Sequence, residues 1–479
     1  MMAELAVQPN LFDRTLDQVR RALRELSTRR GVSTLDLRPD LPETDRQRLL
    51  AQMRDCLEAK GGEVSARARA ANLGRAYMRL NKDGRHRFLT LMAEKFDTSR
   101  KAVDGAIEAV RTADTPETRH DAEVRLRDVL NPPRVRLLTQ FNGLPEGVKF
   151  LVDLRAELIG WAGKEPALAA LSEDMRRLLT TWFDVGFLEM QRITWEAPAA
   201  LLEKLIAYEA VHAITSWDDL KNRLDSDRRC YAFFHPRMPD EPLIFVEIAL
   251  MNGMADNVQT LLDEDQERVA PETTDTAIFY SISNAQRGLD GISFGDFLIK
   301  RVVGALSNEF KNLKSFATLS PVPGFSRWYE REVERLGDTI LLDDEQSALA
   351  DALPEGIDTE TMLRQLLVRP DWADDETLAA ALKPIVLRLA ATYLYTAKRN
   401  STRAMDPVAH FHLSNGARME RLNWMGDVSA RGMRQSAGLM MNYLYKLDEI
   451  DTNHEAYKGE GSIAISSSIR NLARKSSAN

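Results

Sequence analysis

Apolar positions in the first 210 residues recur at helical spacing. One series advances by steps of three and four residues, with charged residues between its members, and comprises Phe12, Leu16, Val19, Leu23 and Leu26. This periodicity is typical of amphipathic helices that bury one face. Glycine and proline interrupt the periodic segments, for example at Gly61-Gly62 and at Asn131-Pro132-Pro133. The pattern therefore predicts an all-helical N-terminal domain of roughly eight or more helices.

The periodicity changes near residue 228. Short runs rich in aromatic and branched residues replace the amphipathic segments, and such runs are typical of β-strands. The predicted elements follow in the order strand 230–236, strand 243–251, strand 277–283, helix 293–310 and strand 313–320. A polar connection with prolines makes the first two strands a hairpin, whereas a strand, a helix and a strand in succession imply a parallel pair. We therefore expect a mixed sheet.

Further elements follow the predicted sheet segments. Helices are expected over 356–398, where Pro384 should kink or divide the longest one. A strand over 418–425 and a helix over 427–447 come next. These segments place both helices and strands in the second half of the chain.

Length and composition agree with a folded protein of several domains. A chain of 479 residues exceeds one ordinary core, and its 44% hydrophobic and 28% charged residues are close to the averages of soluble globular proteins. The predicted fold class is α+β multidomain. An all-helical bundle is expected over 1–210, a mixed-sheet domain over 211–455 and a loosely ordered tail over 456–479.

Charge and cysteine content disfavour several classes of function. A net charge of −8 argues against general nucleic-acid binding. The two cysteines, Cys56 and Cys230, are far apart and lack metal-ligand spacing, so neither a disulfide framework nor a zinc site is expected. Since no run of 18 apolar residues and no targeting pattern occurs, we expect a cytoplasmic protein without a membrane segment.

Ser320 ends the predicted fourth strand and is followed at once by Pro321, Pro323 and Gly324. Proline holds its predecessor in extended geometry and cannot continue a strand, so the segment predicts a stiff turn. A second interpretation is that the stiff turn fixes the serine hydroxyl for chemistry. A Ser-His-Asp hydrolase is disfavoured, because no G-x-S-x-G elbow surrounds Ser320 and Pro321 lacks the N–H that an elbow donates.

The turn Gly288-Leu289-Asp290-Gly291 precedes a predicted helix. Free backbone N–H groups and the positive end of a helix would meet there, which favours phosphate binding. The glycine spacing matches neither the P-loop nor the dinucleotide fingerprint. A plain strand-to-helix turn is the alternative.

Two histidines, His410 and His412, lie in a stretch over 406–418 that has an extended pattern. Alternate residues of a strand share a face, so the two imidazoles are expected side by side, with Phe411 on the opposite face. No carboxylate or cysteine at ligand spacing accompanies them, which disfavours a metal site. A proton donor and an ordinary hydrogen-bonded histidine are the alternatives.

Six segments taken together resemble malonyl-CoA decarboxylase. They are IFYSIS at 278–283, QRGLDG at 286–291, FLIKRVV at 297–303, LSPVPGFSRW at 319–328, DPVAHFHLSNGA at 406–417 and AGLMMNYLY at 437–445. The resemblance runs from near the start of the chain to about residue 450. It implies a helical oligomerisation domain followed by a GNAT-like mixed-sheet acyl-CoA domain, which agrees with the change of period.

The resemblance also implies roles for individual residues. Ser320 and His412 match the active-site serine and histidine of the family. The segment that holds the coenzyme A portion of the substrate matches Asp290, Gly291, Ile292, Ser293, Phe294, Gly295, Asp296 and Ile299. Because Ser293 stands where some family members carry a glutamate, no acid–base role is assigned to this position.

The function implied by the resemblance is conversion of malonyl-CoA to acetyl-CoA and CO2. Loss of CO2 leaves a carbanion that the thioester carbonyl delocalises as an enolate, so we expect no metal and no cofactor beyond the coenzyme A of the substrate. We expect direct decarboxylation without acylation of Ser320, and protonation of the enolate by His412.

The expected partners are malonyl-CoA and further copies of the chain, as a dimer or tetramer through the helical domain, with neither nucleic acid nor membrane. Two other functions stay open. A GNAT-type acyl-CoA acyltransferase would share the fold and the coenzyme turn, and a non-catalytic helical scaffold would use only the N-terminal half. Formation of acetyl-CoA from malonyl-CoA would separate the decarboxylase from both.

Overall fold

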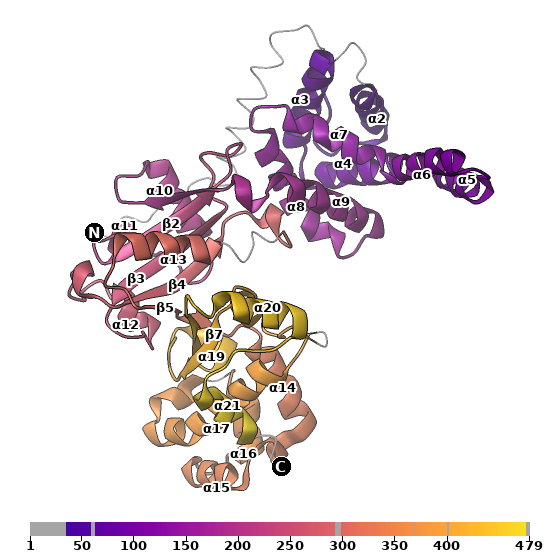
Figure 1. Cartoon of the computed structure of the whole chain (residues 1–479). Coiled ribbons are helices and arrows are strands. Elements are labelled where there is room, and N and C mark those ends of the chain that lie inside the picture. Colours follow the sequence, from indigo (N-terminus) through magenta and orange to yellow (C-terminus); the bar gives the residue numbers. More distant parts are fainter. Residues whose placement is uncertain (1–34, 59–62, 293–297, 369, 400–401, 476–479) are drawn as a thin grey trace. The chain divides into compact units, whose positions relative to one another are not determined.

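A computed structural model gives the structure of residues 35–58, 63–292, 298–368, 370–399 and 402–475 (Figure 1). The chain divides into two compact units. The helical unit consists of Met1–Glu189, Phe233–Ile244 and Asn284–Ser293, and the sheet unit consists of Met190–Ala232, Phe245–Ser283 and Phe294–Asn479. The predicted helix that contains Phe12 and Leu26 lies outside the described residues.

Eight α-helices make up most of the described part of the helical unit. They are α2 (Glu43–Leu57), α3 (Glu63–Arg79), α4 (Lys82–Lys95), α5 (Arg100–Thr112), α6 (Pro116–Leu130), α7 (Pro133–Asn142), α8 (Gly147–Ala162) and α9 (Pro166–Trp182). Polar side chains begin several of them. Asn81 accepts from Gly84 N at 2.9 Å before α4, and Thr115 caps α6 ahead of Pro116. The predicted helical N-terminal domain is confirmed over this part of the chain.

Helix α8 carries much of the core of the helical unit. Its residues Leu151, Leu154 and Leu158 recur at helical spacing and are buried. The ring of Phe150 packs on that of Phe141 of α7, with centroids 5.1 Å apart. The core of this unit is thus formed by helices that pack on each other.

An eight-stranded mixed sheet forms the core of the sheet unit. Its strands are β1 (Glu189–Ile193), β2 (Arg228–Phe234), β3 (Ile244–Met251), β4 (Thr276–Asn284), β5 (Ser315–Thr318), β6 (Ser320–Pro321), β7 (Arg418–Asn423) and β8 (Met440–Tyr445). The order across the sheet is β1-β2-β3-β4-β5-β8-β6, and β7 pairs with β8. Strands β4 and β5 are parallel, with Thr276 opposite Ser315, whereas β8 is antiparallel to β5, β6 and β7.

The predicted strand connections agree with this sheet. Leu243 N donates to Phe233 O at 2.8 Å and Leu250 N donates to Asp227 O at 2.9 Å, so β2 and β3 form the expected antiparallel hairpin. Helix α13 (Leu298–Glu309) connects β4 to the parallel strand β5 and confirms the βαβ unit. The predicted architecture, a helical bundle followed by a mixed-sheet domain, is therefore confirmed.

Further helices accompany the sheet. They are α10 (Ala199–Tyr208), α11 (Trp217–Arg223), α12 (Val258–Leu262), α14 (Phe325–Leu336), α15 (Asp343–Ala352), α16 (Thr359–Gln365), α17 (Glu376–Thr396), α18 (Pro407–Ser414), α19 (Ala430–Ser436), α20 (Ile450–Glu460) and α21 (Ser467–Lys475). Helix α17 runs through Pro384 without interruption, so the proline does not divide it. In the described part of the chain α17 alone has the length and apolar composition of a membrane span. In its most apolar stretch of 18 residues 56% is buried inside the fold, and the helix packs against α15 and α21.

Two predicted helical regions contain strands. Strand β1 lies inside the region 1–210, at the edge of the sheet. Three of its five residues are polar and exposed, and the two apolar ones, Met190 and Ile193, are three positions apart, so the strand lacks the alternation that predicts one. The region 427–447 is α19 followed by β8. Ala437 and Gly438 adopt left-handed φ values of 51° and 74° and end α19. The apolar run that follows is buried on both faces, which removes the period-two signal.

Within the predicted loose tail over 456–479, the described residues 456–475 include the end of α20 and helix α21, which corrects the expectation for this part. Helix α21 places Ile469 and Ala473 four residues apart, with 1% and 2% of their surfaces exposed, and it packs along α17. Ser466 Oγ accepts from Ile469 N at 3.4 Å. Ser466 thus lies at the start of a packed helix.

Candidate active site

The sequence predicted Ser320 at the end of strand 313–320. In the structure Ser320 lies instead in a separate short strand, β6. Leu319 N donates to Phe279 O of β4 at 3.0 Å. The next two residues then pair with β8, Ser320 opposite Met441 and Pro321 opposite Met440. Because proline has no N–H to continue the ladder, β6 ends there. The predicted stiff strand exit is present, and it aligns Ser320 with Met441 near the start of β8.

His412 lies on helix α18, where the sequence predicted an extended stretch. Asp406 accepts N–H groups at the start of this helix, Pro407 occupies its first turn, and Gly416 follows its end with a φ of 79°. These are ordinary start and stop signals of a helix. The eight-residue helix is too short for its apolar period to be distinguished from that of a strand.

The helical conformation separates the two histidines that were expected to share a face. Residues two positions apart on a helix point in nearly opposite directions, because each residue rotates by about 100°. His410 Nδ1 lies 2.8 Å from Tyr457 Oη, whereas His412 points to Ser320. Among the residues that the structure describes, no group of three or more histidine, cysteine, aspartate or glutamate side chains could hold a metal ion.

A chain of hydrogen bonds joins Ser320 to His412 and continues on both sides. Ser320 Oγ lies 3.1 Å from His412 Nε2, and His412 Nδ1 lies 2.8 Å from Tyr445 Oη. On the other side, Ser320 Oγ donates to Thr318 Oγ1 at 2.9 Å, and Thr318 Oγ1 also accepts from Tyr443 N at 3.1 Å. Strands β5, β6 and β8 and helix α18 together place these groups.

Burial keeps the imidazole of His412 neutral. Only 3% of this residue is exposed, and its ring stacks on that of Tyr443 with centroids 4.4 Å apart. Desolvation lowers the pKa of His412 from 6.5 to about 3. At neutral pH one ring nitrogen therefore carries a proton and the other accepts a hydrogen bond.

The environment of His412 differs from that of a hydrolase triad. In a triad a carboxylate holds the second nitrogen of the histidine and stabilises the imidazolium. Here the group at Nδ1 is the neutral hydroxyl of Tyr445. The arrangement orients the imidazole and couples it to the Ser320 hydroxyl, but it supplies no carboxylate at Nδ1 to favour proton abstraction from the serine.

Asn442 supports the strands beneath this chain of hydrogen bonds. Its side chain is fully buried, and Nδ2 donates to Thr318 O at 2.7 Å and to Ala255 O at 2.9 Å. Sequence reasoning assigned no role to Asn442, Thr318 or Tyr445. An asparagine inside the apolar run of β8 was the available signal, since a buried amide must be hydrogen-bonded.

The segment expected to hold coenzyme A is divided between the units. Asp290, Gly291 and Ile292 belong to the helical unit, and Ile299 is a buried residue of α13 in the sheet unit. The remaining predicted residues, Ser293, Phe294, Gly295 and Asp296, lie outside the described residues. The structure therefore describes the first part of the turn and the helix that follows it.

Hydrogen bonds hold the turn onto α8 within the helical unit. Arg155 Nη1 donates to Gly288 O at 2.5 Å and Arg155 Nη2 donates to Asp290 O at 2.9 Å. A Cβ at Gly288 would lie 1.8 Å from Val152 O, so only glycine permits this approach. Three of the turn's N–H groups are used internally, those of Leu289, Asp290 and Ile292. Gly291, with a φ of 77°, reverses the chain.

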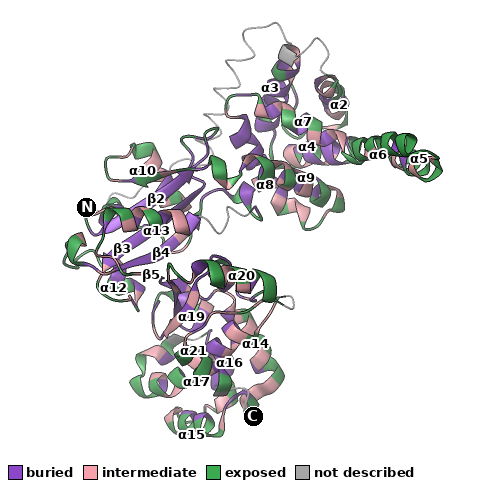
Figure 2. Ribbon diagram, in the orientation of Figure 1, coloured by how far each residue is buried: buried purple, intermediate pink, exposed green. Residues whose placement is uncertain are grey.

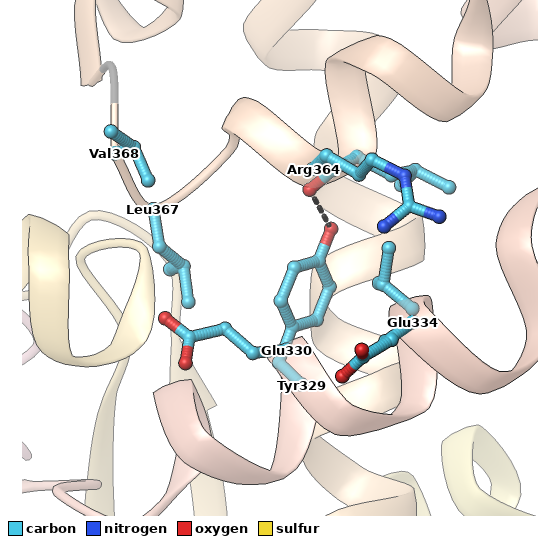
Figure 3. A pocket seen from close by; sticks show the side chains of 8 residues that line it. Tyr329, Glu330, Glu334, Arg364, Leu367 and Val368 are labelled. Carbon is cyan, nitrogen blue, oxygen red and sulfur yellow. Dashed lines mark hydrogen bonds between the residues drawn. The ribbon is translucent and has the colours of Figure 1, made fainter.

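A pocket of about 210 Å³ opens between α14 and α16 (Figure 3). Its lining residues are Tyr329, Glu330, Val333, Glu334, Leu363, Arg364, Leu367 and Val368. Tyr329 Oη donates to Leu363 O at 2.9 Å across its floor. None of the eight belongs to the Ser320–His412 chain or to the predicted coenzyme segment, so this pocket is separate from the candidate active site.

Comparison with protein families gives two matches that together span most of the chain. Residues 96–183 match the malonyl-CoA decarboxylase N-terminal domain, and residues 186–479 match the malonyl-CoA decarboxylase C-terminal domain. The second match covers the sheet, α18 and both Ser320 and His412. The division between the two matches falls at the start of the sheet.

Individual proteins and solved structures similar to this chain are also malonyl-CoA decarboxylases. The mitochondrial malonyl-CoA decarboxylase of Anser anser anser is 40% identical over 359 residues, which are 73% of this chain and 71% of the relative. That of Rattus norvegicus is 38% identical over 374 residues, 75% and 74% of the two chains. Crystal structures of malonyl-CoA decarboxylase from Rhodopseudomonas palustris and Agrobacterium vitis superpose with TM-scores of 0.81 and 0.77 at 44% and 41% identity. Each covers 89% of this chain and 99% of the other.

Proposed function

The chain belongs to the malonyl-CoA decarboxylase family and is a carboxy-lyase, and we propose that its reaction takes place at the Ser320–His412 pair. The observation that carries this assignment is the 3.1 Å contact between Ser320 Oγ and His412 Nε2, two residues 92 positions apart in the sequence. Formation of acetyl-CoA from malonyl-CoA by the purified protein tests the activity itself. The family relationship favours decarboxylation over transfer of an acyl group to an acceptor.

Decarboxylation of malonyl-CoA breaks the bond between C2 of the malonyl group and its carboxylate carbon. The electron pair remains on C2 and is delocalised to the thioester oxygen as an enolate, and a proton then bonds to C2 to give acetyl-CoA. The thioester itself accepts the charge, so the protein has three tasks. It must orient the carboxylate, donate hydrogen bonds to the developing enolate oxygen and deliver a proton to C2.

We assign to Ser320 the orientation of the carboxylate and the hydrogen bond to the enolate oxygen. We assign the delivery of the proton to His412. The Ser320 hydroxyl can rotate from Thr318 Oγ1 to a carboxylate or thioester oxygen of the substrate, since a hydroxyl is both donor and acceptor. His412 is neutral in the free protein. The malonyl carboxylate would bring a negative charge into the same buried region, which raises the pKa of His412 and favours the imidazolium that protonates C2.

The hydrogen bonds around Ser320 support direct decarboxylation without an acyl-enzyme. His412 has the Tyr445 hydroxyl at Nδ1, and Pro321 cannot supply an oxyanion N–H next to the serine. After rapid quenching with malonyl-CoA, the mass of the intact protein should be that of the unmodified chain. A malonyl or acetyl adduct on Ser320 would contradict direct decarboxylation.

We propose that the coenzyme A portion binds the turn and helix start at Asp290, Gly291, Ile292, Ser293, Phe294, Gly295 and Asp296, together with Ile299 one turn further on. The left-handed Gly291 and the anchoring of the turn by Arg155 support this proposal. Because the N–H groups of Leu289, Asp290 and Ile292 are already bonded, phosphate oxygens should meet the backbone at Gly291 and beyond.

We further propose that the chain forms a dimer or tetramer through the helical unit. Helices α5 and α6 form a hairpin that extends away from the other helices of their unit (Figure 1), and most of its surface is exposed (Figure 2). Ile107, Val124 and Leu130 are exposed by 42%, 39% and 52%. Helices of this length are marginally stable alone, so a second copy that covers these apolar residues would stabilise the hairpin.

Light scattering on the double variant Ile107→Glu, Val124→Glu tests the oligomer. We expect a lower molar mass than for the wild type, because two buried charges would oppose the interface. The variant Glu117→Gln changes charge on the same hairpin without altering its apolar residues, and it should keep the wild-type mass. A monomeric wild-type protein, or a double variant with the wild-type mass, would contradict the proposed surface.

The cytoplasmic location expected from the sequence remains a proposal. The animal relatives are mitochondrial by name, and the similar solved structures come from other organisms. Cell fractionation with detection of the endogenous chain would decide the location.

A further inference from the structure

Asp406 holds two separate parts of the sheet unit together with its two carboxylate oxygens. It is 1% exposed and precedes α18, the helix that carries His412. Its Oδ1 accepts from Val408 N at 2.9 Å and from Ala409 N at 3.0 Å, as a helix cap does. Its Oδ2 accepts from Gly324 N at 2.9 Å and from Tyr393 Oη at 3.3 Å. The carboxylate therefore contacts the backbone of the turn that follows Ser320.

The turn that Asp406 contacts has little freedom of its own. Pro321 and Pro323 fix their φ angles, so the place of Ser320 depends on where β6 and Gly324 are held. A Cβ at Gly324 would lie 2.0 Å from Tyr393 Oη and 3.1 Å from Asp406 Oδ2. The absence of a side chain at Gly324 is thus what lets the turn approach the carboxylate.

We propose that Asp406 is a positioning residue for decarboxylation, whose two oxygens fix the turn of Ser320 and the helix of His412 relative to each other. The inference rests on the proposed roles of Ser320 and His412. Asp406 itself contacts neither of their side chains among the described hydrogen bonds. A catalytic pair that is misplaced by about 1 Å loses roughly 10²-fold in rate, so a single anchor between its two supports is expected to matter.

The variant Asp406→Asn separates positioning from helix capping. Asparagine caps helices about as well as aspartate, so its Oδ1 can keep the bonds to Val408 N and Ala409 N. Its NH2 group would then face Gly324 N, donor against donor, and the anchor to the turn is lost. Asp375 provides a matched control, because its Oδ1 accepts from Thr377 N at 2.9 Å and Leu378 N at 3.0 Å at the start of α17.

Kinetic measurements on acetyl-CoA formation distinguish the two roles. We expect Asp406→Asn to lower kcat about 10²-fold with KM for malonyl-CoA unchanged, because the coenzyme contacts are not affected. Asp375→Asn should keep the wild-type kcat. A kcat for Asp406→Asn equal to that of the wild type, or an equal loss in Asp375→Asn, would overturn the proposal.

Gly324→Ala breaks the same hydrogen bond from the other side and serves if Asp406→Asn does not fold. Its Cβ must displace the turn from Tyr393 and Asp406, so we expect the same loss of kcat at unchanged KM; a wild-type kcat overturns the proposal.

Where both single variants fold, the double variant Asp406→Asn, Gly324→Ala should lose no more kcat than either single one, because both substitutions remove the same contact. Additive losses would show independent effects and overturn it. A wild-type protein inactive on malonyl-CoA would instead reject the proposed function.

Discussion

The hydroxyl of Tyr445 provides a sensitive test of how the active-site histidine is held. It lies 2.8 Å from His412 Nδ1, on the opposite side of the imidazole from Ser320. The substitution Tyr445→Phe removes one oxygen and keeps the ring in its place on β8, where Tyr445 is 2% exposed. It leaves a buried ring nitrogen without its partner and releases the orientation of the imidazole.

The size of both effects is worked from the contact between Tyr445 Oη and His412 Nδ1. An unsatisfied buried polar group costs about 1–3 kcal/mol, so the free energy of unfolding should fall by about that amount. A neutral hydrogen bond that helps to orient His412 in the transition state contributes about 1–1.5 kcal/mol. Since 1.36 kcal/mol corresponds to a factor of ten in rate, kcat should fall about tenfold.

The matched control is Tyr457→Phe. Tyr457 Oη lies 2.8 Å from Nδ1 of His410 on the same helix and accepts from Ala404 N at 2.9 Å. Its loss should lower thermal stability by a similar amount, but kcat should remain that of the wild type, because His410 faces away from Ser320. The coupled acetyl-CoA assay and thermal unfolding measure both quantities. Wild-type kcat in Tyr445→Phe, or an equal kcat loss in Tyr457→Phe, would refute the reasoning.

Two further predictions concern pH and coenzyme binding. Burial lowers the pKa of His412 from 6.5 to about 3, so the unfolded chain binds the extra proton between these values. The free energy of unfolding should therefore fall by up to about 1.4 kcal/mol per pH unit below pH 6.5 in the wild type, relative to His412→Asn; parallel unfolding curves would contradict this. Arg155→Met removes the donors to Gly288 O and Asp290 O, and it should raise KM for malonyl-CoA about tenfold with little change in kcat. An unchanged KM would show that the turn does not depend on this anchor.

The sequence predicted the order of the main elements, but not the local structure around Ser320 and His412, whose catalytic roles stay predictions from the resemblance. Short amphipathic and apolar runs have no unique period. The segment around His412 has eight helical residues, too few for the apolar period to separate a helix from a strand, although Asp406, Pro407 and Gly416 mark a helix. The predicted pairing of His410 with His412 failed for this reason.

Residues that complete the site could not be found from spacing, because they come together only through strand pairing. The register of β5 and β6 on β8 places Thr318 Oγ1 at Tyr443 N and Ser320 opposite Met441, and Tyr445 of the same strand reaches His412. No local signal fixes that register, since it depends on which faces of the sheet are buried. The family resemblance supplied Ser320 and His412 individually, and the fold adds the 3.1 Å contact between them.

The βαβ connection, in contrast, was predictable from the sequence pattern. Strand β4, helix α13 and strand β5 each have one type of pattern over their length, and the connection rules for parallel strands leave little choice of topology. The coenzyme segment lies between β4 and α13 of this βαβ connection, but its central residues, 293–296, lie outside the described part of the chain. Their role therefore remains a prediction from the resemblance.

The turnover of malonyl-CoA by His412→Asn tests the central claim most directly, with His410→Asn as the control on the same helix. Loss of a general acid lowers kcat by roughly 10²–10⁴-fold, and we predict a loss in this range for His412→Asn and wild-type turnover for His410→Asn. Ser320→Ala should also lose turnover, because it removes the hydroxyl that orients the substrate. Turnover by His412→Asn equal to that of the wild type would contradict the assignment of the Ser320–His412 pair as the catalytic centre.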